Sequence, residues 1–412
     1  MRMIRLVEPA SMIPVARPAI GEAELQAVRR PLISGWLTQG PEVAAFEREF
    51  AAFVGAPHAC AVANCTTALH LALRAAGVVA GDEVITVSHS FIATANAIRY
   101  CDALPVFVDV CPTTYNMDPA RIEAAISAKT RAILVVHQLG MPCDLRAIVD
   151  LARRHRLPVV EDAACAAGSE TLWNDRWERI GRPHGDVACF SFHPRKVMTS
   201  GEGGMLTTSK AEWDRRFRLW RQHAMTITDT ARHASTRVVV EEYTDLGFNY
   251  RMTDLQAAIG RVQLARLPAM VERRRAIASR YRVLLAKIGD LGLPCEPPWA
   301  RSNWQSYCVR LPAGCDQYRV MQAMLDDGIA TRRGVMCAHR EPAYAREPWR
   351  CEHGPSACGC SGDQCEALGQ SEEISADGLI LPLYDDITEA DQQRVAASLA
   401  AAIAEEDKRL CP

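Results

Sequence analysis

The sequence predicts an α/β protein with a mostly parallel sheet covered by helices on both faces, followed by a smaller α/β domain. Between about residues 59 and 208, short β-branched runs alternate with segments of helical periodicity. Such alternation is typical of parallel strands joined by crossover helices. Beyond residue 300, a second and shorter set of strand and helix patterns follows a long helical stretch. The 412 residues suffice for two or three domains with substantial cores.

The first part of the chain supplies a sheet of seven strands. They are expected at 59–63, 83–87, 104–108, 132–137, 158–161, 187–191 and 204–208. Helices are expected at 66–76, 93–101, 121–128 and 143–154. Ligands of such sheets bind at the carboxyl ends of the strands. We therefore expect the segments 63–67, 161–165 and 191–196 to share one edge.

The second part begins with two helices. The pattern at 253–266 predicts an amphipathic helix capped by Thr253, and a second helix at about 269–288 leads out of the first domain. A strand at 304–311, a helix at 317–327, a strand at 379–382 and a closing helix at 388–406 follow. This order predicts an N-terminal arm (1–30), a large domain (31–265) and a small C-terminal domain (266–412).

Composition argues against two broad classes of function. The chain is 49% hydrophobic and 23% charged, with a net charge of -2, so it offers no broad basic surface to a nucleic acid. No apolar run approaches the roughly 20 residues that cross a bilayer. Residues 1–10 lack the apolar core and cleavage site of a secretory signal. The expectation is a cytoplasmic protein that binds neither nucleic acid nor membrane.

The chain has 16 cysteines, and most of them lie singly inside apolar segments, where they act as small core residues. A cysteine-rich insertion at about 349–372 differs. It holds Cys351, Cys358, Cys360 and Cys365, spaced C-x6-C-x-C-x4-C. Thiolates this close could hold zinc, but the spacing matches no common zinc pattern. A metal site and a disordered or solvent-exposed loop both remain open.

Lys196 ends the hydrophobic run 190–196 and is followed by the glycines of segment 201–204. Glycines at such a position let a bulky planar ligand approach the backbone. An amine that is desolvated beside positive charge loses basicity, and it can then form a Schiff base with a carbonyl such as pyridoxal phosphate (PLP). The alternative is an exposed lysine after a strand.

A strand end runs into a helix at 63–70, where free backbone N–H groups and the positive helix end favour an anion such as phosphate. The hydroxyls of Thr66 and Thr67 would be extra donors, although threonine here can equally be an N-cap.

The strand ending at Asp162 places a carboxylate where it could keep a pyridine nitrogen protonated; it could also cap the next helix. Phe91, at a helix start, could stack on a flat cofactor ring or belong to the core.

The order of these motifs resembles the DegT/StrS-like sugar aminotransferase family of fold-type-I PLP enzymes. The likeness begins at 34–41, continues through the three segments above and 191–196, and returns at 249–254, 339–342 and 381–384. It implies a fold-type-I transferase whose large domain binds PLP. Lys196 would be the Schiff-base lysine and proton carrier, Asp162 the partner of the pyridine nitrogen, and Phe91 the residue against the ring.

The resemblance also assigns the phosphate contacts and the assembly. Cys65, Thr66 and Ser191 would hold the phosphate, and Asn249 of a neighbouring subunit would reach across to it, which implies at least a homodimer. Two positions depart from the family. Cys65 stands where relatives usually have glycine, and Cys165 stands where relatives place Gln or His beside the cofactor's phenolic oxygen. A thiol is a weaker hydrogen-bond partner.

The implied activity is amino transfer in two half-reactions, from glutamate or glutamine to PLP and then to a keto-sugar. The acceptor would be a nucleotide-linked 4-keto-6-deoxyhexose of secondary-metabolite or cell-surface sugar biosynthesis, or a keto-cyclitol of an aminoglycoside-type pathway. Sugar dehydration is disfavoured because relatives with that activity replace the lysine with histidine; a non-catalytic zinc-binding scaffold is the remaining alternative. Trp36, Arg251, His339 and Arg340 are candidates for acceptor binding, since arginine suits phosphates and carboxylates.

Overall fold

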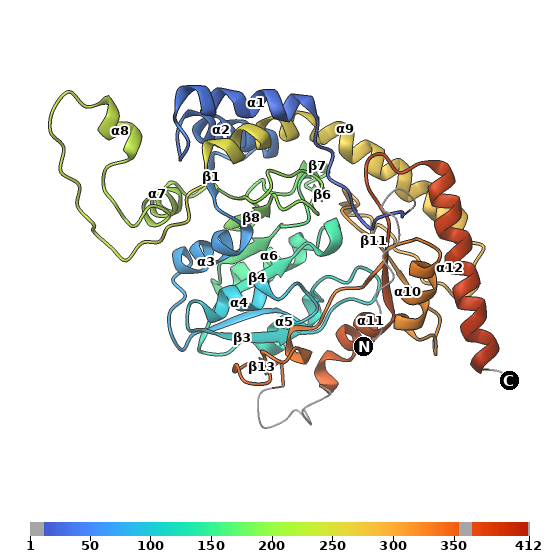
Figure 1. Ribbon diagram of the computed structural model, residues 1–412. Coiled ribbons are helices and arrows are strands. Elements are labelled where there is room, and N and C mark those ends of the chain that lie inside the picture. Colours follow the sequence, from blue (N-terminus) through green and yellow to red (C-terminus); the bar gives the residue numbers. More distant parts are fainter. Residues whose placement is uncertain (1–11, 354–364, 411–412) are drawn as a thin grey trace.

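The structure is a computed structural model that describes residues 12–353 and 365–410 (Figure 1). Its centre is an eight-stranded sheet of order β1-β9-β8-β5-β4-β2-β3-β13. In that order, the strands are His58–Val62, Gly204–Thr208, Val187–Ser191, Val159–Asp162, Thr130–Val136, Glu83–Val87, Leu104–Val108 and Arg350–Cys351. Neighbours pair in parallel except along β9, which runs antiparallel to β1 and β8. The mostly parallel sheet is confirmed, and all seven expected strands are present.

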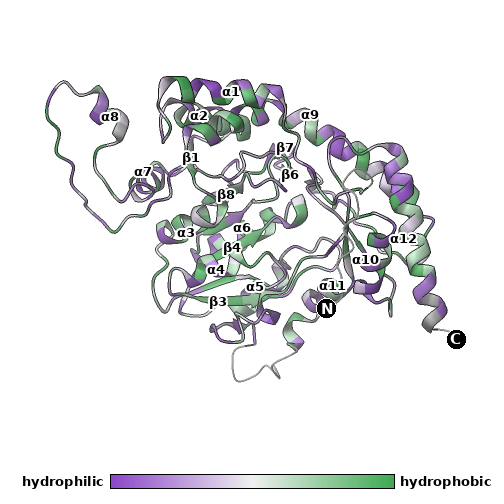
Figure 2. Ribbon diagram, viewed as in Figure 1, coloured by the Kyte–Doolittle hydropathy of each residue, from purple (hydrophilic) through white to green (hydrophobic). Residues whose placement is uncertain are grey.

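Helices cover both faces of this sheet because successive strand residues point to opposite sides. Val84 belongs to a core cluster with Leu69 of α3, whereas its neighbour Ile85 belongs to another cluster with Ile148 of α6. The first face carries α3 (Cys65–Ala75), α4 (Ala93–Arg99) and α7 (Ala211–Trp220); the second carries α5 (Pro119–Ala125) and α6 (Leu145–His155). Figure 2 shows the strands between them as predominantly hydrophobic.

One long helix, α9 (Asp254–Leu285), replaces the two helices expected at 253–266 and 269–288. Pro268 lies inside it, and proline removes one helical hydrogen bond. Packing outweighs that cost, because Leu267 and Met270 on either side of Pro268 are buried in the same core cluster. Further along, Tyr281 is buried in the core of the small domain, so α9 runs from the large domain into the small one as one continuous helix (Figure 1).

The small domain is built on a three-stranded antiparallel sheet of order β11-β14-β12. Its strands are Tyr307–Arg310, Gly378–Leu381 and Arg332–Arg333, and its helices are α10 (Gln317–Asp326), α11 (Gly369–Asp377) and α12 (Glu389–Leu410). A third sheet joins β10 (Ala300–Arg301) to the hairpin of β6 (Glu170–Trp173) and β7 (Arg176–Arg179). No helix in the described parts of the chain is long and apolar enough to cross a membrane.

The cysteine-rich insertion contributes the eighth strand, which the sequence did not predict. β13 pairs in parallel with β3, and the Arg350 guanidinium contacts Glu83 at 2.6 Å. Cys351 and Cys365 are buried in a cluster with Phe107. Cys358 and Cys360 lie outside the described residues, and within the described ones no group of three or more side chains suits a metal ion.

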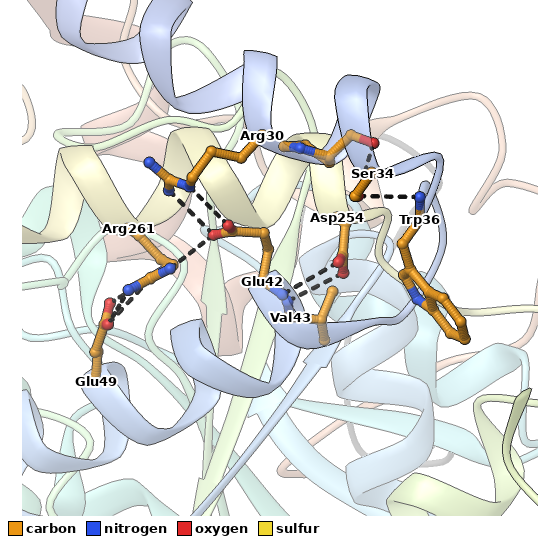
Figure 3. Close-up of polar contacts among 9 residues, drawn as sticks. Arg30, Ser34, Trp36, Glu42, Val43, Glu49, Asp254 and Arg261 are labelled. Carbon is orange, nitrogen blue, oxygen red and sulfur yellow. Dashed lines mark hydrogen bonds and ion pairs between the residues drawn. The ribbon is translucent and has the colours of Figure 1, made fainter. Parts of the chain in front are cut away.

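The N-terminal helices α1 (Glu22–Ser34) and α2 (Pro41–Val54) pack against the start of α9 through charged contacts (Figure 3). The fully buried Asp254 carboxylate accepts hydrogen bonds from the backbone N–H groups of Gly40 (2.7 Å), Glu42 (3.1 Å) and Val43 (3.1 Å). A carboxylate at a helix N-terminus satisfies unpaired donors and favours the helix dipole. Asp254, in the motif 249–254, therefore has a structural role as the cap of α2.

Replacing Asp254 with alanine should destabilise the fold. The change leaves buried N–H groups unpaired, and we expect the free energy of unfolding to fall by about 3 kcal/mol. Urea unfolding followed by circular dichroism measures it. Asp326→Ala, at an exposed position of α10, is the matched control and should change stability by less than about 0.5 kcal/mol. Equal stabilities of the two variants would contradict the capping role.

Candidate active site

A cavity of about 670 Å³ lies between the carboxyl edge of the large sheet and the small domain. The large domain contributes the first turn of α3, the loop after β2 and the ends of β5 and β8, while the small domain contributes the segment 332–336 and part of β14. Seven residues expected at the site line this cavity together: Cys65, Thr66, Phe91, Asp162, Cys165, Ser191 and Lys196. The shared sheet edge predicted from the strand order is therefore present.

The start of α3 has the properties of a phosphate cradle. Asn64 caps the helix, since its Oδ1 accepts the Thr67 N–H at 2.9 Å. The cap is thus Asn64 and not a threonine, and the amides of Cys65 and Thr66 have no acceptor within the helix. Gly204 of β9 is required beside this turn, because a Cβ there would lie 2.5 Å from the backbone carbonyl of Asn64. Backbone donors in this arrangement fit a phosphate.

Cys65 tolerates its place at the start of the cradle because its side chain turns into the protein. It is 7% exposed, and its thiol donates to the Cys189 carbonyl oxygen of β8 at 3.5 Å. Burial raises the pKa of the Cys65 thiol, so the group is uncharged at neutral pH and does not repel an anion bound to the cradle.

Asp162 is held as a buried carboxylate at the end of β5. Its Oδ2 accepts the Thr94 hydroxyl at 2.8 Å, and its Oδ1 accepts the Ala164 N–H at 3.1 Å. Thr94 is fixed in turn by Ser90 at 2.8 Å. Burial raises the pKa of Asp162, which means that a cationic partner is needed to keep it fully ionised. A protonated pyridine nitrogen is such a partner, so the residue fits PLP.

Lys196 directs its amine at the Cys165 thiol, with Nζ 3.1 Å from Sγ. Burial lowers the pKa of Lys196, but the neighbouring Cys165 and Asp162 outweigh it, and the pKa is raised overall. The sequence-based expectation of a lysine made less basic by nearby positive charge is therefore wrong. The groups beside the amine are a thiol and a carboxylate, brought there from β5 and the loop that follows it.

The loop that carries Lys196 is fixed by its own backbone contacts. The Lys196 N–H donates to the His193 carbonyl at 2.8 Å, and Ser200 N–H donates to the Phe192 carbonyl at 2.9 Å. Gly203 faces internal side chains, since a Cβ there would lie 2.6 Å from Ser200 Oγ and 2.8 Å from Met252 Cε. The expectation that glycines of segment 201–204 serve ligand approach is thus corrected at Gly203 and Gly204, which make room for the protein's own atoms.

Phe91 and Ser191 complete the cavity wall. The Phe91 side chain is 60% exposed and lines the cavity, so it is not a core residue. An exposed ring at this place can stack on a planar ligand. The Ser191 hydroxyl, at the end of β8, accepts the His193 N–H at 3.5 Å, which is a weak contact that leaves the hydroxyl available to a phosphate.

Three expected residues lie outside the cavity formed by their own chain. Asn249 is exposed and forms a β-bridge with Gln222. Trp36 Nε1 and Arg251 Nε are buried without a hydrogen-bond partner among the described residues, and the Trp36 ring contacts His233 at a centroid distance of 4.9 Å. These residues are not brought to the Lys196 amine within one chain.

His339 and Arg340, in a 3-10 turn, also lie outside the cavity lining. His339 Nε2 lies 2.8 Å from Glu372 Oε1 and its Nδ1 2.6 Å from Ser88 Oγ. Arg340 donates to Glu372 Oε2 at 3.1 Å. His339 connects α11 to the end of β2, whereas Arg340 contacts α11; for both residues a role in substrate binding stays a prediction.

Sequence reasoning missed several residues of the site. Ser90 and Thr94, which orient Asp162, lie four residues apart in the sequence on either side of Phe91, and that spacing could have drawn attention to them. The cavity residues of the small domain, Gln305 and Arg332 among them, follow no motif, because only the docking of the two domains brings them to the cavity.

Comparison with known proteins agrees with this geometry over nearly the whole chain. The model of the DegT/DnrJ/EryC1/StrS aminotransferase family matches residues 18–400. The spore coat polysaccharide biosynthesis protein SpsC of Bacillus subtilis (strain 168) is 40% identical over 339 residues, which are 81% of this chain and 86% of SpsC.

Solved structures agree as well. The PLP form of Spr1654 from Streptococcus pneumoniae has a TM-score of 0.85 and 25% identity, and the match covers 96% of this chain and 99% of that chain. DesI, solved in the presence of its TDP-sugar product, has a TM-score of 0.83 and 28% identity, and the match covers 97% of this chain and 95% of DesI.

Proposed function

The chain belongs to the DegT/DnrJ/EryC1/StrS aminotransferase family and is a PLP-dependent sugar aminotransferase; we propose that it moves an amino group from glutamate or glutamine to a nucleotide-linked 4-keto-6-deoxyhexose. The observation that carries the proposal is the Lys196 amine in one cavity with the buried Asp162 carboxylate. Amino transfer needs both groups. A histidine in place of Lys196 would have favoured the dehydrating branch.

PLP, when bound, supplies an electron sink for a carbanion on the substrate. Lys196 Nζ would hold the cofactor covalently, and its free amine would carry a proton between two carbon atoms. Asp162 would keep the pyridine nitrogen protonated, and Thr94 orients the Asp162 carboxylate. Phe91 would offer its ring for stacking. The amides of the α3 start, with Thr66 and Ser191, would hold the phosphate, and Cys165 lies beside the lysine amine.

The acceptor is proposed from the relatives and from the cavity. DesI was solved in the presence of its TDP-sugar product, and SpsC is named for spore coat polysaccharide biosynthesis, which supports a nucleotide-linked sugar of a cell-surface pathway. A cavity of about 670 Å³ is within the range of pockets that enclose ligands of this size. A free keto-cyclitol is the second candidate.

A half-reaction assay separates the two acceptors. Enzyme converted to the pyridoxamine form by glutamate or glutamine is mixed with a TDP-linked 4-keto-6-deoxyhexose, or with a keto-cyclitol such as scyllo-inosose. We expect the pyridoxamine absorption to disappear and the PLP absorption to return with the first compound and not with the second. Reaction with the cyclitol alone would contradict the proposed acceptor, and failure of both amino acids to form the pyridoxamine form would contradict the proposed donors.

We also propose that the active site is shared within a homodimer. Asn249 and Arg251 do not reach the cavity of their own chain, and the Arg251 Nε has no hydrogen-bond partner among the described residues. They follow an arm that includes α8 (Asp229–Ala234) and stands away from the body (Figure 1). Its apolar side chains Val238 and Leu246 are 96% and 72% exposed. Contact with a second copy would cover them and bring Asn249 to the partner's phosphate.

Mixing two inactive variants tests the shared site. Asn249→Asp places a negative charge beside the phosphate and should greatly weaken PLP binding, and Lys196→Ala removes the amine. A mixed dimer has one site with both native residues, so activity should return after the two variants are unfolded together and refolded. Refolding each variant alone is the control. Inactive mixtures containing confirmed mixed dimers would contradict the sharing of Asn249.

A further inference from the structure

Two arginine side chains in the cavity lining have no hydrogen-bond or salt-bridge partner among the described residues, and we propose that they form an oxyanion subsite for the substrates. Arg195 immediately precedes Lys196 in the large domain, and Arg332 belongs to β12 of the small domain. The two residues face the same cavity from different domains. The proposal rests on the proposed function for the identity of the substrates, and it names the groups by which they are held.

The two guanidinium groups differ from the other cations that line the cavity because they form no polar side-chain contacts with other described residues. Within residues 12–353 and 365–410, neither takes part in a side-chain hydrogen bond or salt bridge. By contrast, Arg333 donates to Glu341 at 2.8 Å and Lys196 to Cys165 at 3.1 Å. The lining acids do not neutralise the two arginines either, because Asp162 is bonded to Thr94 and Glu202 forms no salt bridge with them.

The backbone at both arginines is fixed although the side chains are exposed. The Arg195 carbonyl accepts the Gln305 side-chain amide at 2.9 Å, and the Arg195 N–H donates to His193 Nδ1 at 3.2 Å. Arg332 pairs with Ile380 in the antiparallel ladder of β12 and β14. Binding an anion would therefore order only the two side chains, which keeps the entropy cost small. The Gln305 contact also links the two halves of the subsite. Gln305 follows α9 in the sequence, and its side chain binds the loop of the large domain that carries Arg195.

The chemistry of the two groups defines the ligand class. A guanidinium presents two parallel N–H donors that match a carboxylate or a phosphate. Both substrates of the proposed reaction carry such groups, because the amino donor has carboxylates and a nucleotide-linked sugar has a diphosphate. The substrates occupy the cavity in turn, so one pair of arginines can serve either or both. The shared chemistry is an oxyanion that lies between Arg195 and Arg332.

Binding of two simple probes to the PLP-loaded enzyme tests the subsite without turnover. Isothermal titration calorimetry would measure the Kd of glutarate, which represents the donor's carboxylates, and of inorganic pyrophosphate, which represents the diphosphate. We expect Arg332→Gln and Arg195→Gln to weaken at least one probe tenfold or more, as for loss of a charge-assisted hydrogen bond. Arg332→Ala, which also removes the charge, replaces the glutamine variant if that variant is unstable.

The matched control is Arg319→Gln, because this arginine of the same domain pairs with Asp316 outside the cavity; it should leave both Kd values within about twofold. Loss of glutarate binding alone assigns the subsite to the donor, and loss of pyrophosphate binding alone assigns it to the acceptor. Unchanged binding of both probes to the arginine variants, or no binding of either probe to the wild type, would overturn the subsite.

The outcome is separable from that of the proposed function. A wild-type enzyme that aminates the keto-sugar while its arginine variants bind both probes normally retains the function and loses the subsite. A wild-type enzyme that binds a probe through Arg332 and aminates no keto-sugar retains the subsite and loses the proposed acceptor.

Discussion

Replacing Lys196 with alanine should yield a folded, colourless protein without a covalent bond to PLP. The amine is the group that bonds to the cofactor and moves the proton, so we expect the rate of amino transfer to fall by roughly 10³-fold or more. Borohydride reduction followed by peptide mass spectrometry measures the bond directly. In the wild type, the reduced PLP mass should appear on the peptide that contains Lys196, and in the variant it should be absent.

Lys210→Ala is the matched control for this experiment. Lys210 pairs with Asp186 at 2.6 Å, away from the cavity, so its loss should alter neither the colour nor the rate. The thermal midpoint of Lys196→Ala should stay close to that of the wild type, because Cys165 is the one described side chain bonded to the amine. A yellow Lys196→Ala protein with a borohydride-reducible bond would show that another amine holds the cofactor.

Replacing Asp162 with asparagine should lower the rate of amino transfer by roughly 100-fold or more. Asparagine has nearly the same shape: its amide oxygen can accept the Ala164 N–H, and its NH2 group can donate to the Thr94 hydroxyl, which can then donate to Ser90. The substitution therefore removes the charge that would keep the pyridine nitrogen protonated. A charged group oriented toward a reacting cofactor in this way contributes about two to three orders of magnitude to the rate. Single-turnover kinetics and the absorption spectrum of bound PLP measure the effect.

Thr94 supplies a graded comparison for Asp162. Thr94→Val removes the hydroxyl and leaves the carboxylate with the Ala164 N–H as its remaining described donor, so we expect a loss of about tenfold, and Thr94→Ser should restore most of the rate. Asp186→Asn, at the surface partner of Lys210, controls for loss of an acid elsewhere. A wild-type rate in Asp162→Asn would exclude Asp162 as the partner of the pyridine nitrogen.

Much of the large domain could be predicted because its signals are local. Each strand is a short apolar run, and the parallel arrangement places its last residue at the edge of the sheet. Asp162 and Lys196 could therefore be assigned to one edge although they lie 34 residues apart in the sequence. Pro268 shows where local signals fail. Proline normally ends or bends a helix, but α9 continues through Pro268, with Leu267 and Met270 buried in one core cluster on either side, and such packing is a property of the tertiary structure.

The residues of the candidate site were likewise predictable only where local sequence patterns place them. Residues on the strand ends and on α3 could be predicted, whereas Arg332 and Gln305 could not, since only the position of the small domain places them in the cavity. The pKa of Lys196 is a further case. From the sequence, desolvation and nearby positive charge are expected to lower it, but the fold turns the amine toward Cys165. Neighbours in space decide the pKa of a buried group.

Transfer of a labelled nitrogen tests the central claim most directly. The enzyme is incubated with PLP, glutamate labelled with ¹⁵N at the α-amino group, and a TDP-linked 4-keto-6-deoxyhexose, and the sugar product is analysed by mass spectrometry. Amino transfer through Lys196 predicts a TDP-amino-sugar that carries the ¹⁵N in the wild type and no such product with Lys196→Ala. Formation of a deoxygenated sugar without nitrogen would contradict amino transfer. Recovery of unchanged keto-sugar from wild-type enzyme, both with labelled glutamate and with glutamine labelled at its amine and amide nitrogens, would contradict it as well.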